Sequence, residues 1–145
     1  MSKRIDFKTQ LQRNAVALIS LVVAITSLGY NTWRNEASEH NRNQRLISIE
    51  VLRNLGDLQQ VVFHLHYDQG VNESINPRTG WAIVLTVKDL AVVLDAPLPD
   101  TAENLRAVWG DNWAALGKDD ASVEAISAAL DTMRDEIHGL LRSLD

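Results

Sequence analysis

The pattern of apolar and polar residues changes near residue 33, and this change predicts the architecture of the chain. Residues 14–33, NAVALISLVVAITSLGYNTW, contain no charged side chain. As an α-helix, twenty residues are about 30 Å long, which matches the hydrocarbon core of a bilayer. The hydroxyls of Ser20, Thr26 and Ser27 can bond to carbonyls of their own helix, so they are tolerated in lipid. The pattern predicts one transmembrane helix at residues 14–33, with lipid as its surroundings.

The flanks of this stretch predict its direction. Residues 1–13 hold four Lys/Arg and one Asp, a net charge of +3. Positive charge collects on the cytoplasmic side of a span, and Tyr and Trp collect at the interfaces. The expected membrane-interface anchors are Arg13, Tyr30, Trp33 and Arg34. The sequence therefore predicts a cytoplasmic stem at 1–13 and a single-pass protein of the inner (plasma) membrane. Residues 34–145 would form a periplasmic or otherwise extracytoplasmic domain.

A cleavable signal peptide is the alternative interpretation of the same segment. It has a basic start and an apolar centre, and Ser27-Leu28-Gly29 fits a small-x-small cleavage site. However, there is no Ala-x-Ala, and polar helix-forming sequence continues after Trp33 without a turn signal. We therefore expect an uncleaved signal-anchor, with one helix that runs from about residue 8 to about residue 67.

The first outer segment predicts an amphipathic helix, and the second is ambiguous. Apolar residues recur every three or four positions, as on one helix face: Leu46, Ile49, Leu52, Leu55, Leu58, Val62 and Leu65. Residues 68–80, with Gly at both ends and an Asn-Pro pair, predict a loop. Residues 81–96 are apolar almost all round. Their length favours a helix, but their Val and Ile content also fits a strand. The alternative fold is therefore α+β, with a short hairpin around residues 61–95.

Two further helices are predicted after Pro99. Asp100 and Glu103 have the spacing of a capping box, and Gly117 suits a helix stop. The last segment repeats apolar residues every three or four positions: Val123, Ile126, Leu130, Met133, Ile137, Leu140 and Leu144. The predicted fold is all-α, with an N-terminal transmembrane helix that continues into a small antiparallel, coiled-coil-like bundle.

Charge and composition exclude several classes of function. From residue 34 onward the chain has ten Lys/Arg and eighteen Asp/Glu, a net charge of −8. Phosphate backbones and anionic lipid surfaces repel such a domain, so we expect neither nucleic-acid binding nor a domain lying flat on lipid. The sequence has no Cys, which excludes disulfides, zinc-thiolate sites and cysteine nucleophiles.

The weak candidates for a metal site are His64, His66 and Asp68. On a strand these alternate residues would share a face and could hold a divalent ion. On the helix that we favour they point apart, so we predict no metal site. No catalytic or phosphate-binding motif is visible in the sequence. We therefore expect no enzyme activity and no cofactor.

Three tryptophans are the candidate interface residues: Trp81, Trp109 and Trp113. Trp109 and Trp113 are four residues apart and share a helix face, which fits a core, but Trp is also a common anchor at protein interfaces. The predicted function is a membrane-anchored interaction or accessory protein that binds a partner in a membrane complex or a second copy of itself. The alternative is a small-ligand-sensing bundle that signals through a partner, but no residue pattern supports a ligand and no second apolar stretch returns to the membrane.

Overall fold

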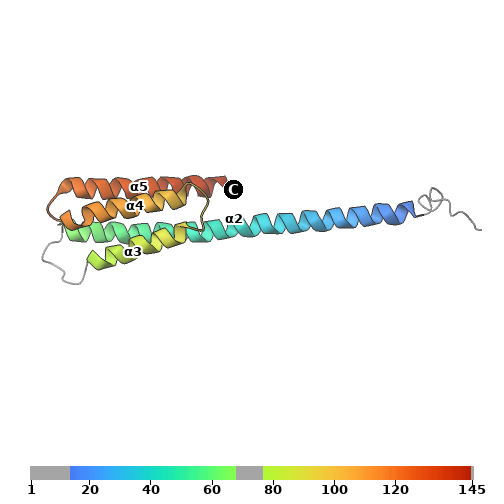
Figure 1. Cartoon of the computed structure of the whole chain (residues 1–145), viewed down its shortest axis with the longest axis horizontal. Coiled ribbons are helices and arrows are strands. Elements are labelled where there is room, and N and C mark those ends of the chain that lie inside the picture. The colour runs from blue at the N-terminus through green and yellow to red at the C-terminus, as the bar shows by residue number, and fades with distance from the viewer. Residues whose placement is uncertain (1–13, 68–76, 145) are drawn as a thin grey trace, which may run out of the picture. The chain divides into compact units, whose positions relative to one another are not determined.

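Every regular element in the part of the chain that the structure describes is helical. The computed structural model describes residues 14–67 and 77–144 (Figure 1). Its elements are α2 (Ala15–Tyr67), α3 (Pro77–Ala91), α4 (Leu98–Asn112), the short 3-10 helix η1 (Trp113–Ala115) and α5 (Asp120–Ser143). The all-α prediction is confirmed. The hairpin alternative is wrong, because residues 61–67 end α2 and residues 81–91 lie in α3.

Helix α2 contributes to two separate units. The first unit ends at His40 and the second begins at Asn41. From Val16 to His40 the apolar side chains of α2 are exposed, whereas from Gln44 onward one face is buried. The predicted end of this helix at residue 67 is confirmed. Its predicted start near residue 8 lies outside the described residues.

In the second unit, α3, α4, α5 and the C-terminal part of α2 pack side by side around one core (Figure 1). The direction of α5 follows from its polar contacts with α2, because residue numbers fall along α5 as they rise along α2. These contacts are Arg45 with Leu144, Gln59 with Arg134, and His66 with Asp120. The two helices are therefore antiparallel, as predicted for the bundle. Among the largest fully buried side chains are Leu55, Leu105, Trp109, Leu130 and Met133.

The buried face of α2 contains Leu55, Leu58 and Val62 of the predicted stripe but differs from it before Leu52. Leu46 and Ile49 are 57% and 59% exposed. The buried positions are spaced by three and four residues and begin with polar side chains: Gln44, Ser48, Val51, Leu55, Leu58 and Val62. The predicted and the buried positions share Leu55, Leu58 and Val62, and before them the neighbouring helices cover the face that opens on Gln44. Because the first two of these buried residues are polar, the hydrophobic pattern of the sequence does not reveal them as core positions.

Gln44 is buried because both ends of its amide are satisfied. Its Nε2 donates to the Val93 carbonyl at 3.0 Å, and its Oε1 accepts from the Asp95 amide at 3.2 Å. These two bonds attach the turn after α3 to α2. A buried amide is tolerated when it is hydrogen-bonded. The pair of bonds therefore explains a polar residue at a core position.

The start of α4 also differs from the prediction. Its N-cap is Pro97, without a side-chain cap bond, and Pro99 lies in the first turn. Proline suits the first turn because the amide it lacks has no partner there in any helix. The helix thus begins before Asp100, and the capping-box prediction is wrong. The α-helix ends at Asn112, before the predicted stop at Gly117, which instead follows the 3-10 turn with a positive φ of 84°.

Helix α5 follows the prediction closely. Asp119 caps its N-terminus, and the carboxylate accepts from the Ala121 amide at 3.2 Å. The predicted stripe is buried from Val123 to Ile137 and partly buried at Leu140 and Leu144. This helix shows the regular spacing most clearly in the sequence, and its whole predicted face packs inward.

Candidate functional site

The three candidate tryptophans occupy different environments. Trp109 is fully buried in the core. Trp81 and Trp113 are half-buried and pack against the edge of the core. Trp109 is therefore a core residue in this structure, which leaves Trp81 and Trp113 as the interface candidates.

Two Gly–Trp contacts join α3 to α4. The Trp109 ring of α4 lies against Gly80 of α3, where an added Cβ would overlap the ring atoms Cζ2 and Cη2. The Trp81 ring of α3 lies near Gly110 of α4, where an added Cβ would be 3.5 Å from Cη2. Each helix thus presents a glycine to an indole of the other. Glycine at Gly80 makes room for the Trp109 ring, whereas at Gly110 a Cβ would be in ordinary van der Waals contact with the Trp81 ring.

An ion cluster lies at the surface of the same helix pair. Lys88 Nζ of α3 lies 3.0 Å from Glu103 Oε2 of α4, and Arg106 Nη2 lies 2.6 Å from Glu103 Oε1. The hydrogen bonds from Arg106 and then from Lys88 lower the pKa of Glu103 to about 2. The bond to Glu103 likewise raises the pKa of Arg106. Lys88, which interrupts the apolar segment of the sequence, therefore links α3 to α4.

The candidate metal ligands are not brought together in the described part of the chain. His66 accepts a hydrogen bond from the Gly117 amide at Nδ1, at 3.2 Å, and its Nε2 lies 3.0 Å from Asp120 Oδ1. Both ring nitrogens are thus occupied within the bundle. His64 is on the same helix, and Asp68 lies outside the described residues. No group of three His, Cys, Asp or Glu is placed to hold an ion among residues 14–67 and 77–144.

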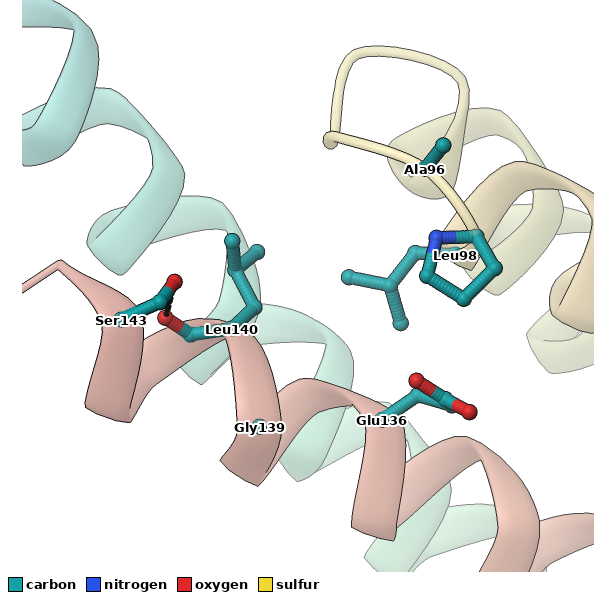
Figure 2. Close-up of a pocket in the computed structure, with 7 residues that line it drawn as sticks. Ala96, Leu98, Glu136, Gly139, Leu140 and Ser143 are labelled. Atoms are coloured by element: carbon teal, nitrogen blue, oxygen red, sulfur yellow. Dashed lines mark hydrogen bonds between the residues drawn. The ribbon is translucent and has the colours of Figure 1, made fainter.

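Among the described residues, grooves lie beside the C-terminal half of α5. The first has a volume of about 230 Å³ and separates residues 96–98 from α5. Figure 2 shows Leu98 and Leu140 directed toward each other across it, with Glu136 at its α5 side. The hydroxyl of Ser143 is turned back to the Leu140 carbonyl, at 2.7 Å. This groove is small and partly apolar.

The second groove has a volume of about 370 Å³ and is basic. Arg45 of α2 lines it together with three residues of α5: His138, Leu141 and Arg142. Sequence reasoning missed this groove. Arg45 is more than ninety residues away from the others, and no local motif connects them.

The apolar part of α2 forms the remaining candidate site. An 18-residue window of this helix has a mean hydropathy of 1.7, and none of it is buried within the protein. Tyr30 and Trp33 are 57% and 65% exposed, with ring centroids 6.2 Å apart. Arg34 is also exposed, whereas Arg13 lies outside the described residues. This is one helix long and apolar enough to cross a membrane.

Comparison of the chain with protein-family models, with curated proteins and with solved structures found no match. The function proposed below rests on sequence and geometry alone.

Proposed function

We propose that this chain is a single-pass membrane protein whose residues 34–145 act as an interaction module outside the cytoplasm. The module would bind a protein of a membrane complex or a second copy of the chain. The observation that carries the proposal is the exposed apolar face of α2 before Trp33.

Eight large apolar side chains of this region are between 43% and 78% exposed: Val16, Leu18, Ile19, Leu21, Val22, Val23, Ile25 and Leu28. Complete burial of one such side chain contributes about 1.5–3 kcal/mol. Transfer of the eight exposed parts from water to lipid is therefore favourable by on the order of 10 kcal/mol. A bilayer supplies an apolar environment for every face of the helix at once.

The direction of the span is supported by charge. The stem at residues 1–13 is net +3, and the sequence after Trp33 is net −8. Lys and Arg near a span are retained on the cytoplasmic side. The proposal therefore places the N-terminus in the cytoplasm and the bundle across the membrane.

The interaction role is supported by apolar side chains that the bundle leaves at its surface. Leu46 and Ile49 of α2, together with Val92 and Val93 after α3, are each more than 55% exposed. The half-buried Trp81 and Trp113 add aromatic surface. Protein interfaces commonly bury apolar and aromatic side chains that are exposed in the free protein.

Alkaline carbonate extraction of membranes that carry the full chain tests the anchor. We expect the chain to stay in the membrane pellet, and Val22→Asp with Ile25→Asp to release it, because a central Asp opposes insertion by about 2.5–3.5 kcal/mol. The matched control is Asn35→Asp with Ser38→Asp, which has the same charge and spacing beyond the apolar stretch. Release of the wild-type chain, or of both double variants alike, would overturn the anchor.

Protease protection of a C-terminal tag tests the direction. A tag cleaved only from the outer side supports the proposed topology, and a tag cleaved from the cytoplasmic side contradicts it. Crosslinking in native membranes then tests the interaction role. A chain that yields only its uncrosslinked form at native abundance would argue against a stable partner or self-association.

A further inference from the structure

The groove between residues 96–98 and α5 contains one charge that the chain itself leaves unpaired. Its walls are apolar at Leu98, which is 1% exposed, and at Leu140, which is half-buried. Glu136 is the charged residue of its lining and is also half-buried. Within the part of the chain that the structure describes, the Glu136 carboxylate has no ion pair and accepts no side-chain hydrogen bond. A partly buried carboxylate of this kind is stabilised by a cation that binds beside it.

The polar side chains of this groove offer acceptors and no free donor. The hydroxyl of Ser143 donates its hydrogen to the Leu140 carbonyl at 2.7 Å, so its oxygen can only accept a further bond. Figure 2 shows Glu136 and Ser143 at opposite ends of the α5 side, with Leu98 and Leu140 facing each other across the gap. The groove therefore matches a group that donates hydrogen bonds, carries positive charge and has an apolar stem.

The size of the groove indicates a single side chain as its occupant. Its volume of about 230 Å³ is below the range of about 300–1,000 Å³ that is usual for small-molecule pockets. A Cβ added to Gly139, in the middle of the α5 side, would meet nothing within 4 Å, so this side is open to an approaching group. One carboxylate and two leucines hold a free small ion only weakly, whereas a side chain delivered by a protein adds to the contacts of a larger interface.

We propose that this groove receives an arginine side chain of a different protein; the inference rests on the interaction role proposed above. Arginine has five N–H donors and no acceptor, and its planar guanidinium matches a carboxylate. It is also more weakly hydrated than lysine, so it enters a partly apolar groove at lower cost. The chain from residue 34 onward is net −8, which attracts a basic partner and disfavours a second copy.

Titration of the full chain with N-acetyl-arginine methylamide in an uncharged detergent tests this inference. The methyl NMR signals of Leu98 and Leu140 report occupancy of the groove. N-acetyl-citrulline methylamide is the matched probe, because it has nearly the same shape and no charge. We expect the arginine probe to shift both signals at millimolar concentration. The citrulline probe should bind about tenfold more weakly, the effect of losing one charge-assisted hydrogen bond.

Three variants locate the site of binding. Glu136→Gln should weaken binding of the arginine probe about tenfold. Glu124→Gln is the matched control, because it removes the same charge from an exposed position of α5 and should leave binding unchanged. Gly139→Leu keeps the charge but fills the groove, so it should also weaken binding. The added side chain meets open space in the free protein, so the fold is retained.

Three results would overturn the arginine site. These are equal affinities for the two probes, equal losses in Glu136→Gln and Glu124→Gln, and tighter binding of n-butylammonium than of the arginine probe. The last result would assign the groove to a free aliphatic amine. Crosslinking in native membranes reports the interaction role independently. A chain that is crosslinked to another protein but does not discriminate between the probes would refute the arginine site and leave the interaction role standing. A chain that is crosslinked only to its own copies, in a way that Glu136→Gln abolishes, would refute a different partner.

Discussion

Replacement of Gly80 by alanine tests the contact between α3 and α4. The added Cβ would overlap two ring atoms of Trp109, and that ring is fully buried, so it has no solvent into which it can move. Overpacking of a core destabilises by about 1–3 kcal/mol. Alanine has a higher helix propensity than glycine, and this difference offsets up to about 1 kcal/mol of the destabilisation. We therefore expect Gly80→Ala to lower the free energy of unfolding by about 1–2 kcal/mol.

Gly56→Ala is the matched control for this substitution. Gly56 is also inside a helix, but an added Cβ would meet nothing within 4 Å. Only the propensity gain remains, so we expect stabilisation by about 0.5–1 kcal/mol. The two substitutions are chemically identical and should have opposite signs.

Urea unfolding of the full chain in detergent, followed by tryptophan fluorescence, measures both variants. For a slope of about 1–3 kcal/mol per molar urea, the Gly80→Ala midpoint should fall by about 0.3–2 M. In the double variant with Trp109→Leu, the destabilisation should be smaller than the sum of the two single effects, because the overlapping ring is gone. A Gly80→Ala midpoint equal to or above that of Gly56→Ala would refute the packing argument.

Two further predictions concern polar contacts. Gln44→Ala removes both bonds to the turn after α3, and we expect it to lower the free energy of unfolding by about 1–3 kcal/mol; an unchanged urea midpoint would contradict this. The pKa of Glu103 is lowered from 4.5 to about 2, so its stabilising contribution is complete above about pH 4.5 and is lost as pH falls toward 2. Glu103→Gln should therefore weaken the loss of stability across that pH range. Identical pH profiles of the urea midpoint for the wild-type chain and the variant would show that the ion cluster of Lys88, Glu103 and Arg106 does not contribute to stability.

The helices could be predicted because their periodicity is a local property of the sequence. In α5, five consecutive stripe members from Val123 to Ile137 are buried as predicted. The end of α2 also follows from local signals. The choice of helix over strand for residues 81–91 rested on length, and the structure bears it out.

The first buried positions of α2 could not be predicted, because they depend on neighbours distant in sequence. Leu46 and Ile49 continue a regular apolar spacing, yet the face that packs inward opens with Gln44. The partners of Gln44 are Val93 and Asp95, about fifty residues later. The start of α4 also differs from the expected one, because the helix begins directly after Pro97 and not at Asp100.

The candidate sites depended even more on tertiary structure. Trp109 and Trp113 share a helix face by spacing, but only Trp109 is fully buried, because α4 gives way to a 3-10 turn at Trp113. The basic groove joins one residue of α2 to three of α5. Nothing in the local sequence around Arg45 indicates that it lines the same groove as Arg142.

The double hydrogen bond of Gln44 has a consequence for how uniquely the helices align. Apolar side chains repeated every three or four residues would pack nearly as well if α2 slid by one turn. Such a slide would bring His40, Asn41 or Ser48 to the position of Gln44; His40 and Ser48 have no amide, and the amide of Asn41 is on a side chain one methylene shorter. The turn after α3 therefore fits the amide and the length of Gln44. A single polar position of this kind selects one alignment among several of similar packing energy.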